Sequence, residues 1–210
     1  MFHEVFPVGP LACNCSILGD PEDGTAIVVD PGDNIDRILK TLEDRQLKLR
    51  AIVVTHAHID HIGGAAKLKA ATGAPVYLRE EDKFLYDNLE WQAQWLGMAT
   101  PQLTDIDVSP REGDTIEAGV ISLQWIHTPG HTPGLSCLYL PAENKLLAGD
   151  TLFLGSVGRT DLPGGNHRQL LQSIHGKLLP LPGHTLVTPG HGPETTLAQE
   201  REHNPFLVNL

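Results

Sequence analysis

The chain has 210 residues, of which 40% are hydrophobic and 20% are charged, and its formal net charge is -11. This hydrophobic content in a chain of this length is enough for a sizeable buried core, so a disordered polymer is excluded. The negative charge also argues against nucleic acid or an anionic membrane as a partner, because both would repel the protein.

The N-terminus and the cysteines bear on the cellular compartment. No apolar run approaches the roughly 20 residues that span a bilayer, and MFHEVFPVGPLACNC lacks the basic and apolar regions of a secretory signal. Three cysteines, Cys13, Cys15 and Cys137, are an odd number, which argues against a disulfide framework. We therefore expect a cytoplasmic protein with reduced thiols. Cys13 and Cys15 would share one face of a strand, where packing is the favoured role and a metal or redox role stays open.

Apolar runs bounded by turn residues recur along the chain and predict strands. In chain order they are AIVVD (26–30), AIVVTH (51–56), VYL (76–78), ISLQWIH (121–127), LSCLYL (135–140), KLLAGD (145–150) and TLVTPGH (185–191). Helical spacing predicts helices at 34–45 behind an Asn34 cap, from His61 to Gly73, at 80–97 and at 167–179. Strands and helices alternate without a linker, so the sequence predicts a single α/β domain over residues 1–210.

The expected helix at 80–97 carries Phe84, Leu85, Leu89 and Trp95 as its apolar residues. Trp91, Trp95 and the nearby Met98 would then pack against the core, with an apolar wall beside a substrate as the alternative.

Polar residues stand where five of the predicted strands end. They are Asp30, His56, His131, Asp150 and His191. Catalytic and binding groups of α/β folds gather on loops at strand ends, so we expect these side chains along one edge of the sheet.

The segment THAHIDHIGG, residues 55–64, is the densest chemical motif. His56 and His58 are two apart and can point the same way, while Asp60 and His61 follow at the start of a helix. Neutral imidazole and carboxylate together suit zinc, iron or manganese. One pair can therefore serve one ion and the next pair another.

The later turns HTPGHTPG, LLAGDTLF and TPGHG add His131, Asp150 and His191. Five histidines and two aspartates exceed the four ligands of a closed structural zinc site. They fit two metal ions that share one carboxylate and keep positions open for water, which indicates catalysis. The chain has no Gly-x-Ser-x-Gly elbow, so hydrolysis with a metal-bound hydroxide is favoured over a serine nucleophile.

These motifs resemble the metallo-β-lactamase superfamily and, within it, the short bacterial glyoxalase II-like hydrolases. The resemblance runs through AIVVDPGD, THAHIDHIGG, HTPGHTPG, AGDTLFLGSVGRTDLPGG and VTPGHGPETT, in family order, and covers nearly the whole chain. It implies an α/β fold of the αββα sandwich type, in which two central mixed sheets carry helices on their outer faces. The helical C-terminal region of classical glyoxalase II would be lacking here.

The resemblance also implies which residues bind metal. His56, His58 and His131 would hold one ion, Asp60, His61 and His191 the other, and Asp150 would bridge them. The two divalent ions are expected to be zinc, with iron or manganese as alternatives. Asp30 matches a family aspartate that supports the ligand loop, and Asp60 could also orient the attacking hydroxide or accept its proton.

The implied activity is that of a hydroxyacylglutathione hydrolase, a thioesterase that converts S-lactoylglutathione to D-lactate and glutathione. Arg159 stands where such enzymes place a basic residue that contacts a glutathione carboxylate, and an ion pair with Asp161 is its equally weighted alternative. The partner is a small thioester or ester, with neither nucleic acid nor membrane, and no oligomeric state is predicted.

A mononuclear-iron persulfide dioxygenase is the main alternative, because such enzymes resemble glyoxalase II. Its ligands would be His56, His58, His131 and Asp150. A β-lactamase or lactonase is less favoured, since β-lactamases of this superfamily usually lack an aspartate at the position of Asp150 and are exported.

Overall fold

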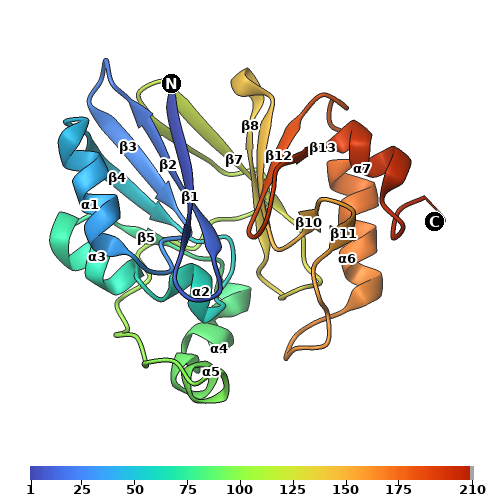
Figure 1. Cartoon of the computed structure of the whole chain (residues 1–210), viewed down its shortest axis with the longest axis horizontal. Helices are drawn as coiled ribbons and strands as arrows, with labels where there is room; N and C mark the ends of the chain where they lie inside the picture. The colour runs from blue at the N-terminus through green and yellow to red at the C-terminus, as the bar shows by residue number, and fades with distance from the viewer. Residues whose placement is uncertain (209–210) are drawn as a thin grey trace. The chain divides into compact units, whose positions relative to one another are not determined.

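The computed structural model describes residues 1–208 and divides the chain into two compact units. Unit 1 comprises Met1–Pro110 and Glu117–Ile121, and unit 2 comprises Arg111–Ile116 and the chain from Ser122 onward. Within residues 1–208, none of the helices combines the length and the apolar character that crossing a bilayer requires. Figure 1 labels the helices and strands of both units.

Unit 1 is built on a five-stranded sheet in the order β1-β2-β3-β4-β5. β1 to β3 pair antiparallel, whereas β3, β4 and β5 pair parallel. The strands are β1 (Phe2–Val8), β2 (Cys13–Asp20), β3 (Thr25–Val29), β4 (Lys48–Val53) and β5 (Val76–Tyr77). All five residues of β3 are buried, as expected for a parallel strand covered on both faces.

The helices of unit 1 follow the parallel strands. They are α1 (Ile35–Asp44), α2 (Ile59–Ile62), α3 (Ala65–Thr72), the 3-10 turn η1 (Glu80–Asp82), α4 (Lys83–Tyr86) and α5 (Leu89–Leu96). In Figure 1, α1 and α3 lie along one face of this sheet. Ile38 of α1 and Leu68 of α3 are fully buried in a core that also contains Ile52 of β4.

Unit 2 contains a six-stranded sheet in the order β13-β12-β9-β8-β7-β6, and β12 and β9 pair parallel. Its strands are β6 (Thr115–Ala118), β7 (Ile121–His127), β8 (Ser136–Leu140), β9 (Lys145–Gly149), β12 (Leu186–Pro189) and β13 (Thr195–Thr196). A separate hairpin joins β10 (Leu152–Phe153) to β11 (Ser156–Val157). The turn from β6 to β7 belongs to unit 1, where Val120 N donates to Asp20 Oδ2 at 2.9 Å.

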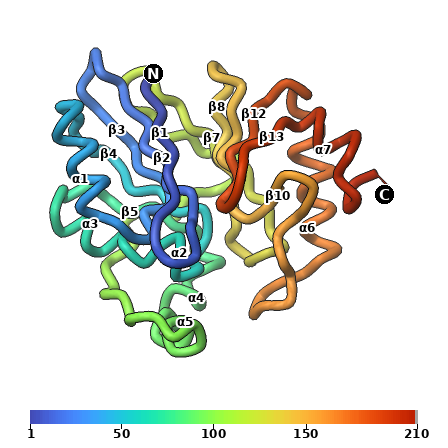
Figure 2. The backbone as a smooth tube through the Cα atoms, viewed as in Figure 1, coloured from blue at the N-terminus to red at the C-terminus, as the bar shows by residue number. Residues whose placement is uncertain are grey.

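The helices of unit 2 are the 3-10 turn η2 (Pro141–Glu143), α6 (His167–Ser173), the π-helical turn η3 (Ile174–Leu178) and α7 (Leu197–His203). Asn166 caps α6 by accepting from Gln169 N, and Thr196 caps α7 by accepting from Gln199 N. Leu170, Ile174 and Leu197 bury the inner faces of these helices in the core of unit 2. The tube in Figure 2 shows α6 and α7 beside each other.

The structure confirms the seven strands expected from the sequence. Within residues 1–208, six further strands (β1, β2, β6, β10, β11 and β13) and α7 were not foreseen. The helix expected at 80–97 is divided into η1, α4 and α5. Its predicted apolar face is partly wrong, because Phe84 and Trp95 are exposed, at 43% and 56%. The packing role of Trp91 is wrong as well, since its side chain is 49% exposed and stacks on Trp95 with ring centroids 6.1 Å apart.

Asn34 occupies the predicted N-cap position of the first helix, α1, but its side chain does not make the capping hydrogen bond. Its backbone has φ 55°, and its Oδ1 instead accepts from Gly9 N in the turn between β1 and β2 at 2.9 Å. Asparagine tolerates this left-handed backbone better than most residues, which explains its use here.

The single sheet edge expected for the polar residues is replaced by two sheets. Asp30 and His56 follow β3 and β4 of the five-stranded sheet, whereas Asp150 and His191 follow β9 and β12 of the six-stranded sheet. The reason is that the sequence shows where strands end but not which strands pair. In each sheet the two strands concerned are parallel neighbours, so their carboxyl ends meet at the same edge.

Candidate metal centre

The ligand loop, residues 54–61, leaves the end of β4 and enters α2. Its first residue after Val54 is Thr55, whose N–H and hydroxyl both donate to Asp30, at 2.7 Å to Oδ1 and 2.8 Å to Oδ2. Asp30 directly follows β3, the parallel neighbour of β4, and is 2% exposed. This buried carboxylate therefore fixes the start of the ligand loop.

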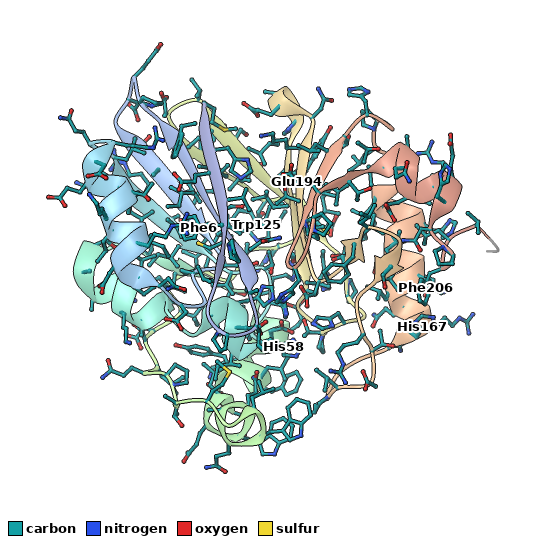
Figure 3. The ribbon with its side chains drawn as sticks, viewed as in Figure 1. Phe6, His58, Trp125, His167, Glu194 and Phe206 are labelled. Atoms are coloured by element: carbon teal, nitrogen blue, oxygen red, sulfur yellow. The ribbon has the colours of Figure 1, made fainter. Side chains whose placement is uncertain are left out.

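His56 and His58 form the first pair of the ligand loop. His56 Nε2 lies 3.1 Å from His58 Nδ1, and His56 Nδ1 lies 3.1 Å from Thr55 Oγ1. Two nitrogens that bind one tetrahedral zinc at about 2.0–2.1 Å are separated by about 3.4 Å. The pair thus has the separation of two ligands on one ion. Figure 3 labels His58, which precedes the first residue of α2.

His61 forms the second pair with Asp60 at the start of α2. His61 is fully buried, and its Nδ1 lies 3.0 Å from Asp30 Oδ2. A proton on Nδ1 donates to that carboxylate, which directs Nε2 to the other side of the ring, 3.7 Å from Asp60 Oδ2. Its ring centroid is 4.0 Å from that of His56. All four candidates of the ligand loop therefore gather in unit 1.

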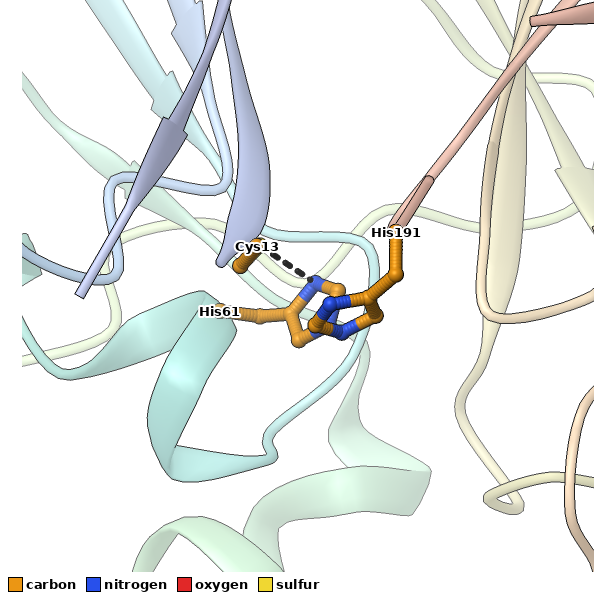
Figure 4. Close-up of side chains that lie close together, drawn as sticks. All are labelled: Cys13, His61 and His191. Carbon is orange, nitrogen blue, oxygen red and sulfur yellow. Dashed lines mark hydrogen bonds between the residues drawn. The ribbon is translucent and has the colours of Figure 1, made fainter. Parts of the chain in front are cut away.

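Cys13, at the start of β2, is a neighbour of this cluster that the sequence did not indicate. Its Sγ lies 3.5 Å from His61 Nδ1, as the dashed line in Figure 4 shows. Burial raises the pKa of this thiol to about 12, with the nearby His61 opposing the shift. The neutral thiol packs as a small apolar group, which agrees with the packing role expected for Cys13 and Cys15.

Unit 2 brings together His131, Asp150 and His191. Asp150 follows β9, and His191 follows β12, the parallel neighbour of β9. Asp150 Oδ2 lies 3.5 Å from His131 Nε2, and Asp150 Oδ1 lies 3.8 Å from His191 Nε2. The two oxygens of one carboxylate thus face two different imidazoles.

A backbone carbonyl orients His131. Its Nδ1 donates to the carbonyl oxygen of Arg159 at 2.7 Å, which assigns Nε2 as the nitrogen that faces Asp150. The chain comes close here because residue 158 is glycine: a Cβ at Gly158 would lie 2.0 Å from the carbonyl oxygen of Asp150. Gly158 therefore permits the close approach of the two segments that brings the Arg159 carbonyl to His131.

The Arg159 side chain takes part in an exposed ion pair. Its Nε and one terminal nitrogen donate to the two oxygens of Asp161, at 2.8 Å and 2.7 Å. This hydrogen bonding lowers the pKa of Asp161 to about 2 and raises that of Arg159. The side chains remain 55% and 68% exposed, so the guanidinium is reachable from solvent in this arrangement.

Helix α7 supports the hairpin that precedes Arg159, a role that the sequence did not reveal. Glu200 is 1% exposed and accepts from Gly155 N at 2.9 Å, and Asn204 Nδ2 donates to Ser156 O at 3.0 Å. Asn204 also donates to Glu200 at 2.7 Å. A polar pair four residues apart on a surface helix gave no signal in the sequence, since such pairs are common on solvated faces.

The donor set in both units fits divalent metal ions. Buried imidazoles whose second nitrogen is held by a carboxylate or a carbonyl are the usual first ligands of zinc, iron and manganese in proteins. His61 is held in this way by Asp30, and His131 by Arg159.

A family comparison covers most of the chain. Residues 8–191 match the model of the metallo-beta-lactamase superfamily. A protein of Aquifex aeolicus (strain VF5) named only as uncharacterized is 47% identical over 100% of this chain and 99% of its own length. The hydroxyacylglutathione hydrolase GloC of Haemophilus influenzae is 38% identical over 97% of both chains. The probable metallo-hydrolase YqgX of Bacillus subtilis is 39% identical over 96% of this chain and 95% of its own.

Solved structures agree with this result. The B3 metallo-beta-lactamase BLEG-1 is 36% identical with a TM-score of 0.88, over 99% of this chain and 100% of its own. TTHA1623, solved in a di-iron-bound form, is 39% identical with a TM-score of 0.88 and the same coverage. ETHE1 from Myxococcus xanthus is 28% identical with a TM-score of 0.84, over 99% of this chain and 85% of its own. The fold class expected from the sequence is confirmed, and the chain belongs to the metallo-β-lactamase superfamily of metal-dependent hydrolases.

Proposed function

We propose that this protein is a binuclear metallohydrolase that cleaves a glutathione thioester of the hydroxyacyl type. The ligands proposed for one ion are His56, His58 and His131, those for the other are Asp60, His61 and His191, and Asp150 bridges. When bound, two divalent cations would lower the pKa of a water molecule and polarise the carbonyl that it attacks. Zinc is the proposed metal, with iron and manganese as alternatives.

The observation that carries the proposal is the placement of Asp150. One of its oxygens faces His131 at 3.5 Å and the other faces His191 at 3.8 Å. If Asp150 bound a single ion together with both histidines, one of its oxygens, or both of them, would point toward that one ion. Divergent oxygens with one imidazole each support a bridge between two ions.

The chain's own groups set the protonation of the site. Asp30 holds the proton of His61 at Nδ1, and the Arg159 carbonyl holds that of His131 at Nδ1. Each ring is therefore oriented with Nε2 as the nitrogen that can bind a cation. Asp60 is 12% exposed at its side chain, and its carboxylate is the group proposed to accept the proton of the attacking water.

Two relatives support the choice of substrate and metal number. The Haemophilus influenzae relative carries the name hydroxyacylglutathione hydrolase, and the match covers 97% of both chains. The di-iron form of TTHA1623 supports two metal positions and keeps iron as an alternative to zinc. Arg159 is proposed to bind a glutathione carboxylate, for which it would have to leave Asp161 or share its guanidinium.

Metal analysis of the purified protein, combined with hydrolysis of S-lactoylglutathione, tests the proposal. We expect two transition-metal ions per chain and thioester cleavage that a chelator abolishes. Asp150→Asn should reduce the metal content toward one ion and lower kcat/KM by at least about a hundredfold. Wild-type activity in Asp150→Asn would refute the mechanism.

The same preparation separates the alternatives. One iron per chain and oxygen consumption on glutathione persulfide, without thioester cleavage, would replace the proposal by a mononuclear dioxygenase. Hydrolysis of a β-lactam at a higher kcat/KM than that of any thioester would assign a β-lactamase instead. Each result would overturn the choice of substrate while leaving the superfamily in place.

A further inference from the structure

The ligand loop alternates two kinds of residue. The metal-ligand candidates His56, His58 and Asp60 stand at even positions, and between them stand Ala57 and Ile59, which are 0% and 2% exposed. Ala57 and Ile59 belong to the hydrophobic core of unit 1. Ligand candidates and core residues thus alternate along this stretch, so the core residues anchor the segment that carries the ligand candidates.

The backbone of the core residues is held by side chains from a distant segment. Ala57 N donates to Asp82 Oδ2 at 3.1 Å, and Ala57 O accepts from Gln92 Nε2 at 3.1 Å. Ile59 N donates to Gln92 Oε1 at 3.0 Å. These three hydrogen bonds bind peptide groups on both sides of His58, in a stretch that is neither strand nor helix at residues 54–58.

Gln92 lies on the inner face of α5, where helical spacing normally calls for an apolar side chain. Its neighbours on that face, Leu89 and Ala93, are 1% and 0% exposed, and Gln92 itself is 5% exposed. Its Nε2 also donates to Leu85 O at 3.0 Å. The amide oxygen therefore faces an N–H and the amide nitrogen faces two carbonyls, so only one orientation of the amide satisfies its surroundings.

Burial of a glutamine costs free energy unless its hydrogen bonds are made, and an apolar residue would fill the same space at lower cost. Asp82 is fully buried as well. Two buried polar side chains aimed at one loop indicate a role beyond packing, because the apolar core around them does not require them.

We propose that Gln92 and Asp82 are positioning residues that hold the ligand loop in its metal-binding conformation. The proposal rests on the proposed function, since it takes His56, His58, Asp60 and His61 as metal ligands. Gln92 acts through Ala57 and Ile59, and Asp82 acts through Ala57. Neither belongs to the proposed ligand set.

Gln92→Leu tests the role of the amide at nearly constant volume, and Gln94→Leu is its matched control. Gln94 lies two residues away on α5 and is exposed, and its Nε2 donates to Glu90 Oε1 at 3.4 Å. Metal-free protein of each variant is titrated with Co²⁺ and Zn²⁺ against a competing chelator. The visible spectrum of the cobalt form and the thermal unfolding of the metal-free form are recorded in parallel.

We expect Gln92→Leu to weaken Co²⁺ and Zn²⁺ affinity by about tenfold to a hundredfold and to change the cobalt spectrum, because the loop can then place its ligands in several ways. Gln94→Leu should match the wild type in both measurements. Wild-type affinity and spectrum in Gln92→Leu, even with a lower unfolding temperature, would show that Gln92 only packs and would overturn the inference. Absence of Co²⁺ and Zn²⁺ binding by the wild type would instead refute the proposed function.

Asp82 provides a second test that does not depend on the folding of Gln92→Leu. Asp82→Asn keeps an oxygen that can accept from Ala57 N and should retain most of the metal affinity, whereas Asp82→Ala removes the acceptor and should lower it. Equal affinities in Asp82→Ala and the wild type would contradict the positioning role. Gln92→Glu keeps the acceptor for Ile59 N but loses the donor to Ala57 O, so it should also lower the metal affinity.

Discussion

Asp30 and Thr55 are joined by two hydrogen bonds, of 2.7 Å from the Thr55 N–H and 2.8 Å from its hydroxyl. The same carboxylate lies 3.0 Å from His61 Nδ1. One buried side chain therefore fixes both ends of the ligand loop. Both carboxylate oxygens of Asp30 are needed as acceptors, because in a buried site the loss of either one leaves a donor without a hydrogen bond.

Asp30→Asn tests this relationship. Its amide nitrogen cannot accept from the Thr55 hydroxyl or from His61, so we expect Zn²⁺ affinity to fall by about tenfold to a hundredfold. Competitive titration with a chelator measures this change. Asp36→Asn, an exposed substitution in the first turn of α1, is the control and should bind Zn²⁺ as the wild type does. Equal affinity of Asp30→Asn and Asp36→Asn would assign Asp30 to folding alone.

Gly32→Ala should damage the site at the first turn of α2. A Cβ at Gly32 would lie 1.6 Å from the carbonyl oxygen of Asp60, so the backbone of one segment must move. We expect the free energy of unfolding to fall by about 1–3 kcal/mol or more, together with a loss of metal affinity. Denaturant unfolding measures the first effect. Gly176→Ala, whose Cβ would meet nothing within 4 Å, should leave both quantities near those of the wild type.

The pKa of Asp161 reports directly on its pair with Arg159. The hydrogen bonds from Arg159 lower this pKa to about 2, and we expect the carboxyl signal in an NMR titration to move at that pH. In Arg159→Ala the midpoint should return toward about 3.9. Because the folded pKa lies below the unfolded one, the pair stabilises the fold above about pH 4 and stops doing so as the pH falls toward 2. An unchanged midpoint in Arg159→Ala would show that Arg159 is not the cause.

Arg159→Ala also tests the proposed contact with substrate. We expect a higher KM for glutathione thioesters and a smaller effect on a small neutral ester, because only the first carries the carboxylates that a guanidinium binds. Steady-state kinetics on the two substrates gives the comparison. Arg168→Ala, an exposed arginine of α6, is the control. Equal losses on both substrates would point to a structural role through Asp161.

The ligand candidates could be predicted from the sequence because their pattern is local. His56, His58, Asp60 and His61 lie in six consecutive residues, and Asp150 and His191 each follow an apolar run that ends in a turn. The parallel pairing of β3 with β4 and of β9 with β12 could not be predicted in the same way, since it depends on contacts between distant segments. For this reason one sheet edge was expected where the chain has two sheets.

Gln92 shows that apolar periodicity does not reveal a polar residue on the buried face of a helix. The apolar spacing of α5 assigned Trp95 to the core, whereas the buried face consists of Leu89, Gln92 and Ala93. A glutamine on that face becomes meaningful only when the peptide groups of Ala57 and Ile59 are known to lie opposite it. Likewise, the strands Phe2–Val8 and Cys13–Asp20 lack a clean alternation of apolar and polar residues, and only their antiparallel pairing defines them.

The hydrogen bonds that Asp30, Asp82 and Gln92 make to the ligand loop have a consequence for how the protein is loaded with metal. They hold the backbone of the loop through protein groups alone, so its conformation does not need an ion to form. We expect chelation to empty the protein without unfolding it, and refilling to be fast and reversible, unlike a domain that folds only around its metal. The ion found in a given preparation would then reflect the metals supplied during growth and purification, because imidazole and carboxylate ligands accept several of them.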